Sequence, residues 1–339
     1  MQRVAVVGAG LAGLTCAQTL RSTGLEVVVI EKSRGVGGRL STRRAQWAQY
    51  DHGAQYFTVR DERFASFVNA GLANGSVAIW QPRLAKRASD NPSQTWYVGS
   101  PGMSALGRAQ ATGLDVRTEM RVQTLVRVDA GWHLAMDDGS HLDGFDAVVV
   151  AVPNEQAVPL IEPHMQSWSQ QLEQTPMQPC WTLMVSTAES LTDLDATLLG
   201  QGQDQKQGVQ GLQGVIGWWA RNSSKPGRPT APGRHDWVIQ ATAEWSQANV
   251  ERSKSDVEHE LLEAFAGELG YPEIKPLEPP MVHRWLYARR RQELAAFNEP
   301  WWQPQISLGV CGDGLTQSRV EQAYLSGLLL GQAMSNILS

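Results

Sequence analysis

Three glycines and one acidic residue near the start of the chain have the spacing that binding a dinucleotide requires. Gly8, Gly10 and Gly13 form a G-x-G-x-x-G pattern, and Glu31 follows eighteen residues after the last of them. A pyrophosphate is best bound by backbone N–H groups at a helix N-terminus, where no side chain stands in the way. Glu31 can accept hydrogen bonds from a ribose 2′-hydroxyl, and its charge would repel a 2′-phosphate. These residues therefore predict a site for the diphosphate and ribose of a dinucleotide.

The segments around these glycines predict the elements that would position them. Residues 4–7 are apolar and predict a strand, an apolar segment that ends at Gly24 predicts a helix, and residues 27–30 predict a second strand. A strand, tight turn, helix and strand within about thirty residues is the context in which this glycine pattern becomes informative. We expect a Rossmann-like unit, with Leu11 and Ala12 of the turn also at the cofactor.

A second glycine-rich stretch distinguishes between two cofactors. Glu31 is followed by Lys32, Arg34 and a glycine cluster that ends at Gly38 and Arg39. A nicotinamide dehydrogenase normally continues from its acid into a helix, whereas a second loop suits the diphosphate and ribityl chain of a larger cofactor. The stretch resembles the FAD-binding signature of the flavin amine oxidase and desaturase superfamily, in which an acid precedes a GG[RK] turn. We therefore expect FAD rather than NAD.

The last part of the chain predicts the other half of the FAD site. Residues 306–311 form a short apolar strand that runs into a Gly-Asp pair, and residues 318–338 predict a long helix. The aspartate can bind the ribityl or phosphate end of FAD. The helix N-terminus can face the flavin pyrimidine, where negative charge develops on reduction. The cofactor-binding residues expected here are Gly312, Asp313, Arg319, Val320 and Glu321.

Two middle segments are also expected at the cofactor. Residues 50–58 read YDHGAQYFT, and their Gly-Ala pair would allow the backbone to approach something bulky, although a simple turn before a strand remains the alternative. Residues 115–136 alternate and predict a meander, which adds Val122. The expected contacts are Gly53, Ala54, Gln55, Tyr56 and Val122.

Composition excludes several classes of protein. Hydrophobic residues make up 42% and charged residues 19% of the 339 positions, as in an ordinary globular protein. The formal net charge is −5, so nothing in the total charge favours nucleic acid or an anionic membrane. Residues 289–291 are three consecutive arginines and are the obvious local exception. We interpret them as a solvated surface segment.

The cysteines and the hydropathy pattern indicate the compartment. Cys16, Cys180 and Cys311 are far apart in sequence and form no C-x-x-C pair, so we expect no disulfide and no metal site. They are interpreted as inert core thiols in a reducing cytosol. We expect a soluble cytoplasmic protein, because no apolar stretch reaches the roughly 18 residues that span a membrane. The oligomeric state is left open.

The expected fold class is α/β, with a Rossmann-like FAD-binding domain and a second, mixed-sheet substrate domain. This is a two-domain fold similar to those of amine oxidases and p-hydroxybenzoate hydroxylase. Residues 145–152 are a continuous apolar run and predict a buried parallel strand that returns to the first sheet. The Gln- and Gly-rich residues 200–214 predict a mobile loop. The FAD domain is expected from residues 1–50, 98–158 and 280–339, and the substrate domain from 51–97 and 159–279.

Several segments together resemble the renalase family, in particular its bacterial members within the flavin amine oxidase superfamily. The Gln-rich insert has no expected counterpart in that family, and residues 314–318 lack a bulky aromatic found in some relatives. The segments that carry the resemblance are 32–39, 51–58, 101–106, 220–228, 283–289 and 311–327.

The resemblance implies an oxidase of isomeric dihydronicotinamides with non-covalent FAD. Such enzymes oxidise 2- and 6-dihydro forms of NAD(P) to NAD(P)⁺, pass a hydride to flavin N5, and reduce dioxygen to hydrogen peroxide. The partners would be the dinucleotide substrate and dioxygen. Stacking a ring on the flavin demands positioning more than acid–base chemistry. The residues expected to line the substrate face are Tyr56, Trp218, Asn222, His283 and Trp285.

Two other readings stay open at this point. One is a flavin amine oxidase or desaturase that acts on another small substrate. The other belongs to a different class, a protein that binds FAD for structure and catalyses nothing. His283 and Trp285 alternate along an expected strand, so one of them could equally be a core residue.

Overall fold

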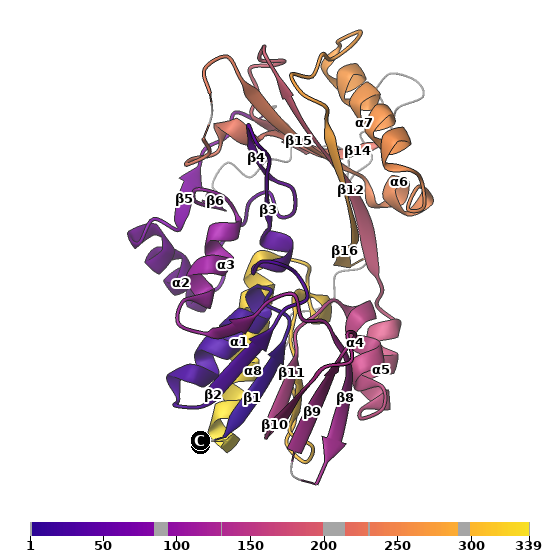
Figure 1. Ribbon diagram of the computed structural model, residues 1–339. Coiled ribbons are helices and arrows are strands. Elements are labelled where there is room, and N and C mark those ends of the chain that lie inside the picture. Colours follow the sequence, from indigo (N-terminus) through magenta and orange to yellow (C-terminus); the bar gives the residue numbers. More distant parts are fainter. Residues whose placement is uncertain are drawn as a thin grey trace.

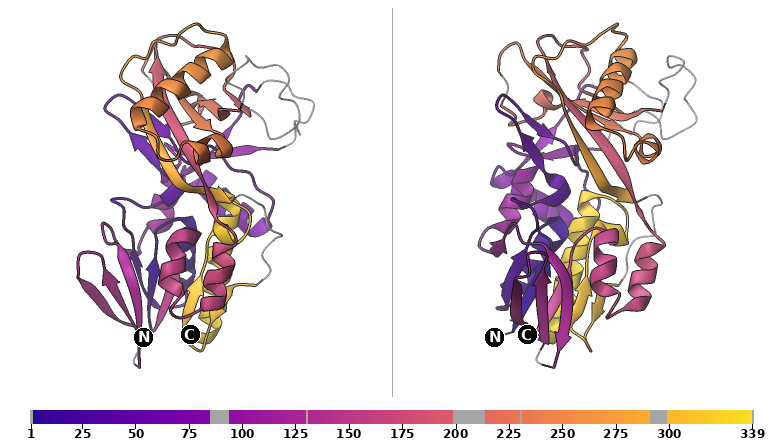
Figure 2. Two further views of the ribbon diagram at one scale, coloured as in Figure 1. Left: turned by 90° about the vertical axis from the view of Figure 1, so that its right-hand side faces the viewer. Right: turned by 45° about the vertical axis from the view of Figure 1, so that its right-hand side comes forward.

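The structure is a computed structural model that describes residues 2–84, 94–129, 131–198, 214–229, 231–290 and 299–338. Figure 1 shows two halves, a lower one built on a largely parallel sheet and an upper one built on an antiparallel sheet. The two chain termini lie near each other at the far end of the lower half (Figure 2). The expected two-part α/β fold with a Rossmann-like half is confirmed.

Six strands form the first sheet in the order β17-β18-β11-β1-β2-β7. All neighbours pair in parallel except β17, which runs antiparallel to β18 at the edge. The apolar run that predicted a returning strand does pair with β1, which confirms that prediction. The bounds are β1 (Arg3–Val7), β2 (Glu26–Ile30), β7 (Asp115–Arg117), β11 (Ala147–Val150), β17 (Trp301–Gln303) and β18 (Leu308–Val310).

Alternate residues of β1 face the two layers that cover this sheet, as the period of two in a strand requires. Val4 and Val6 pack against α1 (Leu11–Ser22) and the long helix α8 (Val320–Leu338). Ala5 and Val7 face the other layer. That layer holds the meander β8 (Val122–Val128), β9 (Gly131–Met136) and β10 (His141–Phe145) with helices α4 (Asn154–Ile161) and α5 (Gln166–Glu173).

Five strands form the second sheet in the order β13-β14-β15-β12-β16, and all four pairings are antiparallel. Helix α7 (Lys254–Leu269) covers its outer face, where two buried tryptophans, Trp219 and Trp237, pack around Phe265. The strand bounds are β12 (Met177–Thr187), β13 (Ala196–Leu198), β14 (Ile216–Arg221), β15 (His235–Ala241) and β16 (Met281–Arg290), and the short helix α6 spans Ala243–Ala248.

Smaller elements connect the two halves. Asp61 is the N-cap of helix α2 (Glu62–Ala73), and its side chain accepts a hydrogen bond from the Arg63 backbone N–H. The other elements are β3 (Thr42–Arg44), β4 (Gln49–Asp51), β5 (Val77–Trp80), β6 (Trp96–Gly99), α3 (Ser104–Ala111) and the 3-10 turns Gly38–Leu40, Asn222–Ser224 and Asp313–Leu315.

Two sequence-based expectations need correction. Residues 281–290 form a strand of the second sheet, so the last piece of the FAD-binding half begins after them rather than at 280. The arginine run is not a solvated segment throughout, because Arg290 is buried and donates to the carbonyl of Thr316 at 3.2 Å. A strand of this length alternates inside and outside, which a run of like charges conceals.

Three remaining expectations concern the insert, membrane spans and the thiols. Of the Gln-rich insert at 200–214, only Gly214 lies within the described residues. None of the helices in the described ranges combines the length and apolar character that crossing a membrane requires. Cys16 and Cys311 are neighbours inside the core, although 295 positions separate them in sequence. A hydrogen bond between the two thiols, together with burial, raises the pKa of Cys16.

Candidate active site

A cavity of about 2440 Å³ lies between the two halves and is lined by residues from both sheets. Sites for single small ligands usually measure about 300–1,000 Å³, so this cavity has room for a large cofactor and a second ligand. Every expected cofactor residue except Gly13 lines it. Four of the five expected substrate-face residues line it as well.

The N-terminus of α1 forms the floor of the cavity at the first sheet. Gly10 is the N-cap, no side chain caps the helix, and Leu11 and Ala12 line the cavity. Gly13 lies behind them, where a Cβ would come within 2.1 Å of the Gly8 carbonyl oxygen, so its role is the close packing of helix and strand. Uncapped backbone N–H groups beside open space fit a diphosphate.

Glu31 lies at the end of β2 with 7% of its surface exposed. One carboxylate oxygen accepts from the backbone N–H of Ala9 and the other from that of Ser33, both at 2.8 Å. A carboxylate has further lone pairs, so the same oxygens remain able to accept from a ribose hydroxyl. Lys32 and Arg34 follow along the cavity wall.

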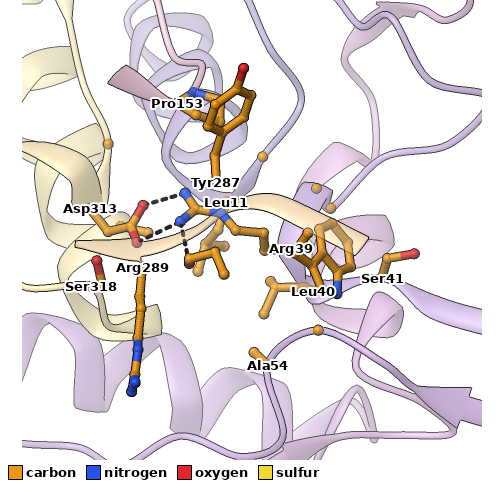
Figure 3. A pocket seen from close by; sticks show the side chains of 18 of the residues that line it. Leu11, Arg39, Leu40, Ser41, Ala54, Pro153, Tyr287, Arg289, Asp313 and Ser318 are labelled. Carbon is orange, nitrogen blue, oxygen red and sulfur yellow. Dashed lines mark hydrogen bonds and ion pairs between the residues drawn. The ribbon is translucent and has the colours of Figure 1, made fainter. Parts of the chain in front are cut away.

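Arg39 and Asp313 connect the two ends of the chain across the cavity (Figure 3). The guanidinium of Arg39 donates to both carboxylate oxygens of Asp313, at 2.5 and 3.1 Å, and to the carbonyl oxygen of Ala288 at 3.0 Å. Figure 3 shows Leu11 and Ser318 close to this pair, with Tyr287 and Arg289 projecting from β16. The two halves of the FAD site expected from sequence therefore meet here.

The backbone of residues 52–54 crosses the cavity and is held from three sides. The Ala54 N–H donates to the Arg39 carbonyl at 2.9 Å, and a Cβ on Gly53 would come within 2.1 Å of that same oxygen. The indole N–H of Trp285 donates to the His52 carbonyl, and the Gln240 amide donates to the Gly53 carbonyl, both at 2.8 Å. Only glycine fits at position 53 without moving the turn.

A buried charged network lies behind this loop. Asp51 is fully buried and accepts from Arg228 at 3.1 Å and from the Met103 backbone N–H at 2.9 Å. The ammonium of Lys225 lies 3.5 Å from the Asp51 carboxylate and donates to Gln55 at 3.1 Å. Burial lowers the pKa of Lys225 to about 7, an effect that the charge of Asp51 partly offsets. The network fixes the loop from below.

Asn222 belongs to this supporting network and not to the substrate face, which corrects the sequence-based expectation. Its side chain is fully buried, accepts from the Asp51 backbone N–H at 3.2 Å and donates to the Gln49 carbonyl at 2.7 Å. It does not line the cavity. Its position directly after β14 gave no sign that its amide faces inward.

Four residues form one row across the second sheet, and three of them, Trp218, Gln240 and His283, line the cavity. Trp218 is paired with Gln240, Gln240 with Thr182, and Thr182 with His283, so the row runs through β14, β15, β12 and β16. Residues that pair directly in an antiparallel sheet share a face. The neighbouring row, Trp219, Ile239, Leu183 and Val282, faces α7 instead.

Aromatic rings surround this row. Tyr56 stacks on Trp96 at 3.9 Å between ring centroids and lies 5.4 Å from Trp218. Burial raises the pKa of Tyr56, so its hydroxyl stays protonated. Trp285 lies 4.4 Å from His283 and 5.0 Å from His52. The structure thus places Tyr56, Trp218, His283 and Trp285 along the same cavity.

At the N-terminus of α8, three expected cofactor residues line the cavity but differ in role. Glu321 accepts from the backbone N–H groups of Arg60 and Asp61, at 2.7 and 2.9 Å, and so ties the loop before α2 to the helix. Arg319 and Val320 line the cavity beside it. On the opposite wall Val122 also lines the cavity, as expected.

The charge of the cavity differs in sign from that of the whole chain. Among the described residues, twelve arginine and lysine side chains and six aspartate and glutamate side chains line it, whereas acids outnumber bases in the sequence. Such an excess of positive charge attracts anionic ligands. The diphosphate of one FAD would neutralise part of this positive charge, and a second anionic ligand would neutralise more of it.

Sequence reasoning missed His52, Gln240 and the Asp51 network. His52 lay within a stretch that was singled out for its glycine, and its flanking aspartate and glycine were the one available signal. Gln240 carries no local signal, because its role depends on the register between strands that are far apart in sequence.

Comparison with known proteins assigns most of the chain. A model of the flavin containing amine oxidoreductases matches residues 79–333, and a model of an NAD(P)-binding Rossmann-like domain matches residues 6–70. Together with the glycine cradle, these matches identify FAD as the cofactor.

One sequence relative is the renalase of Mus musculus, which is 28% identical over 172 residues. That match covers 47% of this chain and 49% of the renalase, so the chain spans about half the length of that relative. It spans 8–14% of four further curated relatives, which are named as two oxidases, a desaturase and an oxygenase.

Solved structures with the same fold are much more distant in sequence. A protoporphyrinogen oxidase from Exiguobacterium has a TM-score of 0.76 at 11% identity, with 99% of each chain covered. Cyclohexylamine oxidase from Brevibacterium oxydans has a TM-score of 0.71 at 13% identity, also with 99% of each chain covered. At these identities the likeness concerns the fold alone.

Proposed function

The chain belongs to the family of flavin-containing amine oxidoreductases, and on that premise we propose that it oxidises isomeric dihydronicotinamide dinucleotides. The substrate would be a 2- or 6-dihydro form of NAD(P) and the product NAD(P)⁺. When bound, FAD supplies the hydride acceptor and passes two electrons to dioxygen, which leaves as hydrogen peroxide.

The observation that carries the proposal is the neutral, partly aromatic row on the second sheet. Loss of hydride turns a dihydropyridine into an aromatic cation, so the surrounding residues must not repel a positive ring. Burial is the main cause that lowers the pKa of His52 and of His283 to about 4, so both are neutral at physiological pH. The faces of Trp218 and Trp285 can stabilise a cation.

The positive lining of the cavity also favours a dinucleotide. Arg43 and Arg44 are exposed on β3 and Arg108 is exposed on α3, and all three line the cavity. The charge of Arg43 helps to lower the pKa of both His52 and His283. Partial burial is the larger cause that lowers the pKa of Arg108, and the nearby charge of Arg44 lowers it further. These side chains are suited to a phosphate beyond the ring.

Cys180 fits non-covalent binding of the cofactor. It lines the cavity, but burial raises the pKa of its thiol to about 11. A protonated thiol is a poor nucleophile, so Cys180 is not suited to bond with a flavin. The other two cysteines lie in the core of the first half.

A second candidate is oxidation of a small amine. The stacked rings of Tyr56 and Trp96 beside Trp218 could hold an ammonium group, and cyclohexylamine oxidase has this fold. The excess of arginine and lysine in the cavity counts against it.

An anaerobic titration separates the two candidates. The purified yellow protein is mixed with 2-dihydro-NAD, 6-dihydro-NAD, ordinary NADH and a panel of amines while flavin absorbance is followed. Rapid bleaching by an isomeric dihydronicotinamide, with NAD⁺ formed and peroxide released on adding air, is the expected result. Bleaching by amines alone would replace the proposal with the second candidate, and bleaching by nothing would favour a protein that uses FAD for structure.

A further inference from the structure

Two histidines from distant parts of the chain form a pair inside the cavity. His52 precedes the Gly-Ala turn, His283 lies on β16, and their ring centroids are 4.8 Å apart in an edge-to-face arrangement. Trp285 contacts both rings and also donates its N–H to the His52 carbonyl. The indole therefore fixes the pair as one unit.

The pair has hydrogen-bonding capacity that the described residues leave unused. His52 is 4% exposed, lines the cavity, and its Nδ1 atom is buried with no hydrogen-bond partner among them. A buried polar atom without a partner is energetically unfavourable, and native proteins seldom retain one without a function. Trp218, in the same row as His283, repeats the pattern, because its indole N–H is also buried and has no hydrogen-bond partner among the described residues.

The chemistry of the pair specifies the group that would satisfy it. A neutral imidazole carries one donor and one acceptor nitrogen, so two of them offer both functions side by side. Arg43 and Lys254 are the positive charges that act on the pair, and Asp51 is the negative one. A carboxylate would prefer two cations, and an ammonium would prefer acceptors alone. A primary carboxamide has an acceptor oxygen and a donor nitrogen and matches both imidazoles.

We propose that His52 and His283 together bind the carboxamide of the dihydropyridine ring and thereby fix its orientation and the specificity of the site. The inference rests on the proposed function. Neither histidine takes up the hydride or a proton, because each contributes only hydrogen bonds. The pair would reject rings that carry an acetyl group or a carboxylate at the same position, since these lack the amide donor.

The test measures ligand binding rather than turnover. Oxidised holoprotein is titrated with nicotinamide mononucleotide, its 3-acetylpyridine analogue and nicotinic acid mononucleotide, and the change in the flavin spectrum gives each Kd. The wild type is expected to prefer the carboxamide at least tenfold. His283→Phe and His52→Leu should reduce that preference below threefold, and His52→Asn should retain it, because an amide can replace the imidazole Nδ1. His141→Leu, on an exposed part of β10, is the matched control.

Other results would overturn the inference. Equal weakening of all three ligands would mean that the rings matter only for shape. A changed flavin spectrum or FAD affinity in ligand-free His52→Leu, with ligand preference intact, would assign His52 to the cofactor. If the wild type binds none of the three, both proposals fail. If it prefers the carboxamide but no dihydronicotinamide bleaches the flavin, only the proposed function fails.

Discussion

The two sides of the cavity bind by different means. The side formed by the first sheet presents backbone atoms and glycines, whereas the side formed by the second sheet presents a row of side chains. A backbone surface recognises features that all dinucleotides share. A side-chain surface recognises what distinguishes one substrate from another. Binding at the first side should therefore be most sensitive to substitutions that add side-chain atoms. Binding at the second side should be most sensitive to substitutions that remove them.

The largest effect is expected from adding atoms at two glycines of the first side. A Cβ at Gly10 meets no protein atom within 4 Å, whereas one at Gly13 comes within 2.1 Å of the Gly8 carbonyl. Gly10→Val should fold but lose FAD affinity by about 100-fold or more, because its side chain occupies the diphosphate position. Gly13→Val should not fold. Flavin content and circular dichroism measure both.

The matched control for this pair is Ala73→Val, since Ala73 is exposed at the end of α2 and lies outside the cavity. It should keep both fold and flavin. Full flavin content in Gly10→Val would contradict the backbone mode of binding.

The next largest effect is expected where the two sides are joined. Asp51→Asn removes the buried carboxylate that pairs with Arg228 and Lys225, and breaking a buried ion pair typically costs about 3–5 kcal/mol. The midpoint of denaturant unfolding should fall accordingly. Asp61→Asn, whose partner Arg63 is exposed, should cost under about 1 kcal/mol and serves as control. Similar losses for both would mean that the network does not hold the loop.

Lys225 should also leave a signature in the pH dependence of stability. Burial lowers its pKa to about 7 from the usual 10.5, so between these values the unfolded chain binds one proton more than the folded chain. Stability therefore rises with pH in this window, by about 1.4 kcal/mol per pH unit, and the penalty is fully present below pH 7. The difference in unfolding free energy between wild type and Lys225→Met, measured from pH 7 to 10, should show this slope. A flat difference would rule out a neutralised Lys225.

The smallest effect is expected from Arg43, a charged residue of β3 that lines the cavity. Arg43→Glu should raise the KM for a dihydronicotinamide dinucleotide about tenfold at low salt, since Coulomb attraction to phosphate becomes repulsion. Added salt should shrink the difference. Arg127→Glu changes the net charge equally but lies outside the cavity, and its KM should stay near that of the wild type. An equal rise of KM in both variants would mean that only the net charge of the protein matters, and not the position of Arg43 at the cavity.

The contrast between the two sides also explains what sequence could predict. Gly8, Gly10 and Glu31 were recognisable because they lie close together along the chain and carry their own strand and helix signals. His52 and His283 meet across 231 positions, and their contact depends on the register of β12 with β16. Strand register depends on the packing of the whole sheet and cannot be predicted from any short segment of sequence. Asn222 was misplaced for the same reason.

Trp218 and Trp219 are adjacent in sequence, yet one faces the cavity and the other the core beside α7. The same division applies to Gln240 and Ile239 and to His283 and Val282. The backbone of one sheet thus separates side chains that can contact a ligand from side chains that pack in the hydrophobic core. Lineages could diversify the first set while purifying selection retains the second. A laboratory library randomised at 218, 240 and 283 should therefore yield many folded proteins with new substrates, whereas one at 219, 239 and 183 should yield few folded ones.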